Sequence, residues 1–399
     1  MTIEMFEKPL GMRDDFPVIA KQKANLRKQG TELIEQAGYE LLQTPTLEYY
    51  ETIGRISAIS DDALFKLLDS QGKTLVLRPD MTSPIARVAA SKLLREKMPI
   101  RLGYYSNVFR AQKREGGRPA EFEQMGVELI GDDSLYADAE VISLAWDILK
   151  QVGVGSARIV VGHTRLLELI LADFGLDSEQ SSKVRELFVA KNGVGVEQLS
   201  RELPISSNKL ASFLALMQAT TVADWKQWIN NENEEQIKLY HDMERLEELF
   251  KRNGLGDAIT FDISFSSHMT YYTGLVFECY GAGSGFPLGS GGRYDGLMEQ
   301  FGLQVGATGF GLRVDRLLES VSPEKIEEPQ TLILFDEQSE QRAFEKAQQM
   351  RASGKRVTLQ YAPAVQALEP FTDLFTEVIR GEALDNGLIN DCHAKRQNF

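Results

Sequence analysis

The residues whose types and spacing could do chemistry are most concentrated in residues 109–131, FRAQKREGGRPAEFEQMGVELIG. Arg110 ends an expected strand, and the loop after it carries three further cations and one acid, a local charge that suits a phosphate chain. On the next strand, Gln124 and Glu128 are four residues apart, so they share one face with Phe122. A solvated hairpin with scattered charge explains the same local pattern, and on this segment alone it is the simpler explanation.

A second polar cluster, LRPDMTSPIAR, begins at the end of an expected strand over 73–77. Asp80 and Thr82 stand just after this strand, where side chains often meet ligands. Turn chemistry is again the simpler explanation, because Pro-Asp is a common turn pair and Thr82 can cap the helix expected at 83–94.

Tyrosines and glycines gather in two later segments, SSHMTYYTGLVFE at 266–278 and GSGGRYDGL at 289–297. Tyr271, Tyr272 and Tyr294 beside a glycine-rich strand can form a pocket wall with inward hydroxyls. Core packing and a tight hairpin explain these residues equally well.

Glycines also mark GATGFGLRVDRL at 306–317, where a glycine-rich turn is expected to lead into a helix at 312–320 that carries Arg316. The glycines allow other backbone segments to approach closely, although a plain turn before a core helix is favoured on the pattern alone. No GxxxxGK[ST] loop occurs and no GxGxxG follows a leading strand, so P-loop and Rossmann nucleotide sites are excluded.

The elements that must position these clusters do not alternate regularly between strand and helix. Strands are expected at 101–110, 121–130, 157–161 and from 259 onwards, and helices at 18–38 and 136–151. Residues 164–252, rich in Leu, Glu, Lys and Gln, predict a helical insertion. We therefore expect an α+β protein with a mixed, largely antiparallel sheet.

Domain boundaries follow from this order. We expect one sheet domain over 1–320, a linker over 321–330 and a small α/β tail over 331–399, in which a strand, a helix and a strand succeed one another.

Composition excludes several other classes. The chain has 399 residues, a net charge of −14 and 43% hydrophobic residues, which argues against bulk disorder and against a broad surface for polyanions. Two cysteines and four scattered histidines give neither a disulfide framework nor zinc-ligand spacing, so no metal or cofactor is expected. The acidic, proline-broken N-terminus does not resemble a signal peptide, and no long uncharged apolar run occurs, so we expect a cytoplasmic protein without a membrane partner.

Taken together and in this order, the clusters resemble the class II aminoacyl-tRNA synthetases, and histidyl-tRNA synthetase in particular, from Lys8 to about Leu317. The segment around Pro45 resembles the first family motif, 109–131 the second and 306–317 the third. LRPDMT, YYTG and GGRYDGL are typical of the histidine-specific branch. The resemblance implies an antiparallel sheet of six or seven strands flanked by helices, in a homodimer formed through the first motif.

The resemblance also implies roles for the residues singled out above. Arg110 would bind the α-phosphate of ATP, and Arg316 would face the terminal phosphates. Asp80 and Glu128 would hold the ammonium group of histidine, and tyrosines would line its imidazole. The positions that match the ligand pocket are Asp80, Thr82, Arg110, Gln124, Glu128, Tyr271, Tyr272 and Tyr294.

Four positions depart from the synthetase pattern. Ser267 stands where the family has its catalytic arginine, and loss of one aimed donor typically costs about 10²–10³ in rate. Gln112 replaces a carboxylate that contacts adenine, Ala120 replaces a loop arginine, and Arg313 replaces a glycine and places a long side chain in the ATP site. With Arg316, these are positions of a degenerate ATP site, and we expect no catalytic residue here.

The tail supports the same interpretation. Residues 331–399 are fewer than the roughly 100 of the family's anticodon-binding domain, and they carry more acidic than basic residues, so no tRNA partner is expected. The chain is therefore similar to the regulatory subunits of ATP phosphoribosyltransferase, a synthetase-like family without the anticodon domain. That family implies a hetero-oligomer with the short catalytic subunit, activation of that subunit, and feedback by histidine on the first step of histidine biosynthesis.

Two alternatives remain open at this point. One is a divergent histidine-activating ligase or a true histidyl-tRNA synthetase, in which another cation such as Arg313 compensates for the missing arginine. The other is a different synthetase paralogue, either an amide-forming enzyme or a stress-sensing pseudo-synthetase domain. The histidine-branch motifs and the lack of a kinase domain count against this last possibility.

Overall fold

The chain divides into two compact units, Met1–Ser322 and Pro323–Phe399. The computed structural model describes residues 6–93, 98–111, 119–202, 207–265, 272–282, 284–321, 330–381 and 390–391.

The first unit is built on a mixed sheet. Its strands lie in the order β1 (Glu40–Leu41), β5 (Ile100–Phe109), β6 (Glu121–Ile130), β11 (Ala307–Arg313), β10 (Gly289–Arg293), β9 (Leu275–Tyr280), β7 (Arg158–His163) and β8 (Ile259–Phe261). The five pairs from β5 to β7 are antiparallel, and the two edge pairs, β1 with β5 and β7 with β8, are parallel. The mixed, largely antiparallel sheet is confirmed.

The strand count differs from the six or seven antiparallel strands that the resemblance implied, because eight strands are present in the described residues. The two short edge strands account for the difference. Parallel neighbours cannot be joined by a tight turn and need a crossover. The helical segment 164–252 provides that crossover between β7 and β8.

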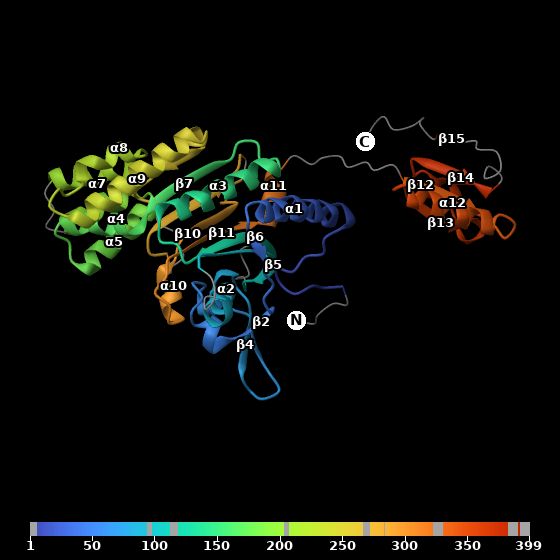
Figure 1. The fold of residues 1–399 in the computed structure, drawn as a ribbon, viewed down its shortest axis with the longest axis horizontal. Helices are drawn as coiled ribbons and strands as arrows, with labels where there is room; N and C mark the ends of the chain where they lie inside the picture. Colours follow the sequence, from blue (N-terminus) through green and yellow to red (C-terminus); the bar gives the residue numbers. More distant parts are fainter. Residues whose placement is uncertain are drawn as a thin grey trace. The chain divides into compact units, whose positions relative to one another are not determined.

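One face of the sheet is covered by α1 (Pro17–Gln36), α3 (Leu135–Gln151) and α11 (Val314–Ser320), as Figure 1 shows. In α3, the buried residues Val141, Ala145 and Ile148 recur every three or four positions, which gives the helix one apolar face. Gly30 brings α1 against the sheet, because a β-carbon there would collide with the sulfur of Met125 on β6.

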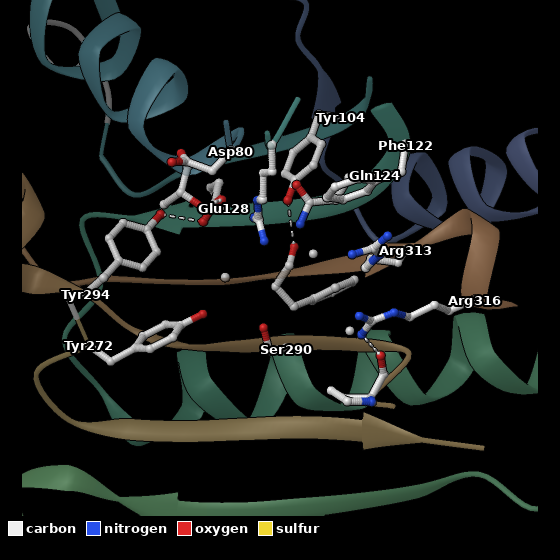
Figure 2. A pocket seen from close by; sticks show the side chains of 17 residues that line it. Asp80, Tyr104, Phe122, Gln124, Glu128, Tyr272, Ser290, Tyr294, Arg313 and Arg316 are labelled. Atoms are coloured by element: carbon white, nitrogen blue, oxygen red, sulfur yellow. Dashed lines mark hydrogen bonds between the residues drawn. The ribbon is translucent and has the colours of Figure 1, made fainter. Parts of the chain in front are cut away.

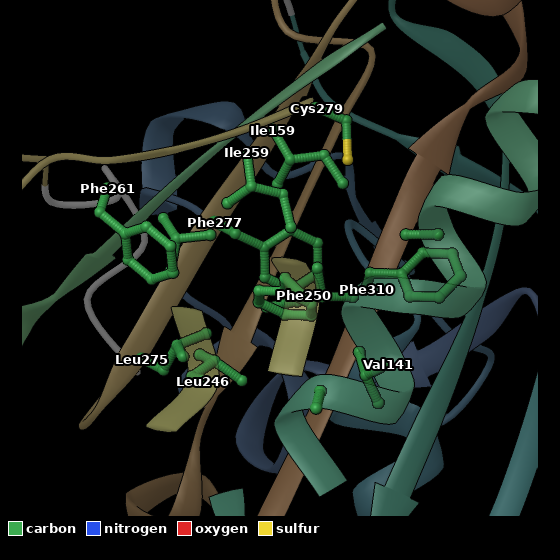
Figure 3. Close-up of a cluster of buried hydrophobic side chains, with 14 of the residues drawn as sticks. Val141, Ile159, Leu246, Phe250, Ile259, Phe261, Leu275, Phe277, Cys279 and Phe310 are labelled. Atoms are coloured by element: carbon green, nitrogen blue, oxygen red, sulfur yellow. The ribbon is translucent and has the colours of Figure 1, made fainter. Parts of the chain in front are cut away.

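A continuous apolar core lies between this helical layer and the sheet. Figure 3 shows part of it, with Phe277 of β9, and with Phe310 of β11 next to Val141 of α3. Leu246 and Phe250, on α9 (Glu234–Arg252), extend the same core into the helical insertion. The insertion is therefore continuous with the sheet domain in packing.

On the other side of the sheet lies a smaller layer with its own apolar cluster. It contains the three-stranded sheet β2 (Leu47–Tyr49), β4 (Thr74–Leu77) and β3 (Lys66–Leu68), the helix α2 (Thr82–Val88) and the helix α10 (Asp295–Gln300). A π-helical turn, Ala89–Leu93, extends α2, so the helix expected at 83–94 is present as far as the described residues reach. The candidate site lies between this layer and the main sheet.

The segment 164–252 is helical, as its composition predicts. It forms α4 (Thr164–Asp173), α5 (Ser178–Val189), α6 (Gly193–Glu202), α7 (Ser207–Gln218), α8 (Val222–Trp225) and α9. Polar caps begin several of these helices. Asp177 and Gln180 form a reciprocal capping box on α5, and Asn233 accepts the N–H of Gln236 at the start of α9.

The second unit has a four-stranded sheet in the order β13 (Arg356–Tyr361), β12 (Gln330–Phe335), β14 (Glu377–Arg380) and β15 (Asn390–Asp391). The helix α12 (Glu340–Ala352) joins β12 to its parallel neighbour β13, which is the expected strand–helix–strand order. A short helix, α13 (Leu368–Thr372), precedes β14. Ile333, Ala343 and Ala347 form the centre of this unit's apolar core.

Among the described residues, no helix combines the length and the apolar character needed to cross a bilayer.

Candidate functional site

A pocket opens where β6, β10 and β11 face the layer that carries α2 and α10 (Figure 2). Seven of the eight residues expected to line the ligand pocket do so: Asp80, Thr82, Arg110, Gln124, Glu128, Tyr272 and Tyr294. The eighth, Tyr271, lies outside the described residues.

The positions of the degenerate ATP site are distributed differently. Arg313 and Arg316 line the same pocket, whereas Gln112 and Ser267 lie outside the described residues. Ala120 is buried beside the pocket and does not line it. Its N–H donates to the carbonyl of Gly11 at 2.8 Å, and a β-carbon on Gly11 would collide with it, so this backbone contact leaves little room for a long side chain.

Two carboxylates form the acidic end of the pocket. Glu128 is 1% exposed, and it accepts hydrogen bonds from the Thr82 hydroxyl at 2.8 Å and from the Tyr294 hydroxyl at 2.6 Å. Burial raises the pKa of Glu128 to about 8, because the two hydrogen bonds only partly offset the loss of solvent and the nearby charge of Asp80 adds to the rise. At neutral pH this carboxyl is therefore mostly protonated in the empty pocket.

Asp80 is the second carboxylate, and it also caps a helix. Its Oδ1 accepts the backbone N–H of Ser83 at 2.8 Å, and its Oδ2 accepts the hydroxyl of Ser57 at 2.6 Å. The prediction that Thr82 caps this helix is wrong: Asp80 takes that role, and the Thr82 hydroxyl turns to Glu128 instead. Asp80 therefore serves the local turn, and both Asp80 and Thr82 also line the pocket.

The middle of the pocket depends on strand register. Glu128 pairs with Gly309 and Gln124 with Arg313 across β6 and β11, so all four positions are on one face. A β-carbon on Gly309 would collide with the carboxylate of Glu128, and one on Gly311 would collide with the amide of Gln124. The expected close approach at these glycines is present.

The prediction of a turn over the same glycines is wrong, because residues 307–313 form the strand β11 and the helix begins only at Val314. Pairing on both sides, with β6 and with β10, holds the glycines extended despite their low strand propensity.

Arg313 and Arg316 form the opposite end of the pocket (Figure 2), whereas Arg110 lines the pocket but is bonded next to Asp80. Arg110 donates from Nε to the carbonyl of Pro79 at 2.9 Å, and Arg316 donates to the carbonyl of Pro287. Arg313 forms a side-on ion pair with Asp315, with Nη2 at 2.7 Å from Oδ2. The pocket is therefore acidic at one end and basic at the other, an arrangement suited to a zwitterion.

Sequence reasoning missed Tyr104 and Ser290, which also line the pocket. Tyr104 lies opposite Gly126 on β5, and its hydroxyl reaches across the glycine to the carbonyl of Phe310 at 3.2 Å. Tyr104 and Tyr105 are adjacent, and their own types do not show which of them faces the site. The available signal was Gly126, whose missing side chain leaves room for a tyrosine on the paired strand.

Within the ranges that the structure describes, no group of three or more His, Cys, Asp or Glu side chains is arranged to hold a metal ion.

Comparisons with known proteins support the resemblance. Residues 11–317 match the family model described as histidyl-tRNA synthetase, and residues 332–381 match the model described as the C-terminal domain of the histidyl-tRNA synthetase HisZ. An ATP phosphoribosyltransferase regulatory subunit from Lysinibacillus sphaericus is 47% identical over 94% of this chain and 97% of its own length. One from Bacillus subtilis is 42% identical over 94% and 96%.

Solved structures agree. A crystal structure described as an ATP phosphoribosyltransferase regulatory subunit/histidyl-tRNA synthetase from Bacillus halodurans superposes with a TM-score of 0.88 at 41% identity, covering 95% of this chain and 99% of that one. Apo histidyl-tRNA synthetase from Staphylococcus aureus, at 21% identity, a TM-score of 0.67 and coverage of 96% and 94%, shares the fold. The family predicted from the sequence is confirmed, and the chain belongs to the ATP phosphoribosyltransferase regulatory subunits, which have a histidyl-tRNA synthetase-like fold.

Proposed function

We propose that this chain is the non-catalytic regulatory subunit of ATP phosphoribosyltransferase in the first step of histidine biosynthesis. It assembles in the cytoplasm with the short catalytic subunit, activates it and conveys feedback by histidine. The observation that carries the proposal is a pocket that keeps the expected carboxylates and tyrosines at its amino-acid end, while the chain's own side chains fill its nucleotide end.

Histidine fits the intact end. Asp80 and Glu128 offer carboxylates to an ammonium group, and Tyr272 and Tyr294 line the same space. The buried Oε1 of Gln124 has no hydrogen-bond partner among the described residues, and an N–H of the ligand would supply one. With Ser267 in place of the arginine that holds the substrate carboxylate in the synthetases, histidine binds weakly or with help from the catalytic subunit.

Adenylation is not supported at the other end. Arg110 and Arg316, which would contact phosphates in a synthetase, each donate to a main-chain carbonyl here. Arg313 lies against the ring of Phe122, with its Cζ 3.6 Å from the ring centroid. A histidine-activating ligase would have to rearrange this end before ATP could bind.

Two assays on the purified full chain test the function. Histidine-dependent ATP–pyrophosphate exchange, with a true histidyl-tRNA synthetase as positive control, should give no signal. Addition of the chain to a short-form catalytic subunit should raise phosphoribosyltransferase activity, and histidine should modulate it. Robust exchange would instead favour the histidine-activating ligase, and folded chain that leaves the catalytic subunit unchanged would contradict the regulatory role.

The homodimer is part of the proposal, and an apolar face supports it. Register places Leu47, Tyr49 and Leu67 on one face of the β2–β4–β3 sheet, and these side chains are 44%, 48% and 44% exposed. An apolar patch of this kind is typical of an interaction surface. Leu47→Asp with Leu67→Asp should shift the mass measured by light scattering from dimer to monomer. Leu374→Asp, which changes an exposed leucine of the second unit, serves as the matched control.

A further inference from the structure

The ring of Phe122 is the aromatic surface of the basic end. Phe122 lies on β6, is 3% exposed and lines the pocket together with Arg110, Arg313 and Arg316. Aromatic faces next to cations are the surfaces on which proteins stack nucleobases. A nucleotide that entered this end with its phosphates near the arginines would use this ring.

The side chain of Arg313 already covers the ring of Phe122. The Cζ of Arg313 lies 3.6 Å from the centroid of the Phe122 ring, which is stacking distance, and the Cζ of Arg110 lies 5.4 Å from the same centroid. Figure 2 shows Arg313 beside Phe122 and Gln124 at this end of the pocket, away from Glu128 and Tyr294.

Arg313 is fixed in this position from its other side. Its Nε and Nη2 donate to the two carboxylate oxygens of Asp315 at 3.2 and 2.7 Å. Arg313 is the last residue of β11, and Asp315 lies in the first turn of α11, so two rigid elements hold the pair. A two-point contact sets the plane of the guanidinium and keeps the cation over the ring.

The two residues of the pair line different pockets. Arg313 lines the pocket described above, whereas Asp315 lines a second hollow bounded by Arg13, Lys23 and Leu318, and Phe122 lines both. Removal of the Arg313 side chain would expose the ring of Phe122 to the first pocket.

From this geometry we propose that Arg313 determines the specificity of the pocket: it occupies the nucleobase-stacking face of Phe122, so the site accepts an amino acid and rejects a nucleotide. The proposal rests on the proposed function, because it takes the acidic end to be the amino-acid site. At the nucleotide end, the Arg313 side chain therefore occupies the position that a nucleobase would take, and the ion pair with Asp315 keeps Arg313 in that position.

The test is a calorimetric titration of the full chain with ATP and, separately, with tripolyphosphate, which has the phosphates without the base. Arg313→Gly, which restores the synthetase residue, should bind ATP about tenfold to a hundredfold more tightly than the unaltered chain does. Its affinity for tripolyphosphate should not rise, because the substitution removes a cation. Arg313→Lys is the matched control, and it should show little gain.

A double variant, Arg313→Gly with Phe122→Ala, should lose the gain because the ring is gone. The proposal is overturned if the unaltered chain binds ATP within threefold of Arg313→Gly, or if the double variant keeps the gain. Should Arg313→Gly fail to fold, Arg313→Ala replaces it under the same expectations. Activation of the catalytic subunit by the unaltered chain is measured separately, so failure of the proposed function is distinguishable.

Discussion

The hydroxyl of Tyr294 donates to Oε2 of Glu128 at 2.6 Å, and this bond joins two residues 166 positions apart in the chain. Glu128 lies on β6, and Tyr294 stands between β10 and α10. Because both side chains are buried, the bond closes the acidic end of the pocket and keeps a proton-accepting group out of water. The protonation state of Glu128 is then coupled to the charge of the ligand that enters the pocket.

Histidine binding should release a proton near pH 7. The pKa of Glu128 is about 8 in the empty pocket, so the carboxyl is mostly protonated, and an incoming ammonium group favours the ionised form. Calorimetry in buffers of different ionisation enthalpy measures the proton count. Glu128→Gln cannot ionise and should release fewer protons and bind histidine more weakly; equal proton counts and equal affinities would contradict the assignment.

The same carboxyl makes folding stability depend on pH. Its pKa is raised above the unfolded value near 4.5, so the folded state binds more protons than the unfolded state between about pH 4.5 and 8. The stability contributed by the protonated form is therefore complete below pH 4.5 and is lost as pH rises through 8.

Glu128→Gln should consequently gain stability relative to the unaltered chain as pH rises from 6 to 8.5. Urea titrations of both proteins across this range measure the difference. The comparison cancels the pH dependence that other groups contribute to the stability of both proteins. One such group is His163, because burial lowers its pKa to about 4. A difference that stays constant with pH would mean that Glu128 is already ionised in the folded protein.

Gly309→Ala should damage the pocket and also destabilise β11, because a β-carbon there would collide with the backbone carbonyl oxygen of Val127 as well as with the carboxylate of Glu128. The new methyl would occupy the place of the Glu128 carboxylate, which must then leave its bonds with Thr82 and Tyr294. We expect histidine affinity to fall at least tenfold, measured by calorimetry. Gly155→Ala is the matched control, because a β-carbon there meets no other atom within 4 Å, and it should leave binding unchanged.

The pocket roles came from the family resemblance, but part of the geometry that positions these residues could be predicted from local spacing. The interval between Gln124 and Glu128 fixes a shared face once 121–130 is a strand, and β6 spans those residues. The helix α3 and the helical insertion followed in the same way from apolar spacing. These features depend on neighbours a few residues away.

The errors arose where distant segments decide the structure. Residues 307–313 have glycines that favour a turn, yet pairing with β6 and β10 makes them a strand. Thr82 is a good helix cap, but Glu128, 46 residues away, competes for its hydroxyl. The stacking of Arg313 on Phe122 likewise depends on the register between β6 and β11, which no local pattern states.

Lys191 ties the helical insertion to the segment that precedes Ser267. It lies in the turn between α5 and α6, where its backbone φ of 50° is in the left-handed region that a lysine seldom adopts. Its Nζ lies 2.6 Å from Oδ2 of Asp262, contacts the hydroxyl of Ser264 and donates to the carbonyl of Met217 at 3.1 Å. Three chain segments thus converge on one ammonium group.

Lys191→Met should therefore lower the free energy of unfolding by about 1–3 kcal/mol, because the mostly buried Asp262 would lose its cation. Urea unfolding followed by tryptophan fluorescence reports on the first unit alone, since the three tryptophans, Trp146, Trp225 and Trp228, all lie there. Lys183→Met is the control: its exposed ion pair with Glu179 contributes at most about 0.5 kcal/mol. Equal losses in the two variants would show that the Asp262 contact adds nothing beyond a surface pair, and that the insertion is held by its apolar core alone.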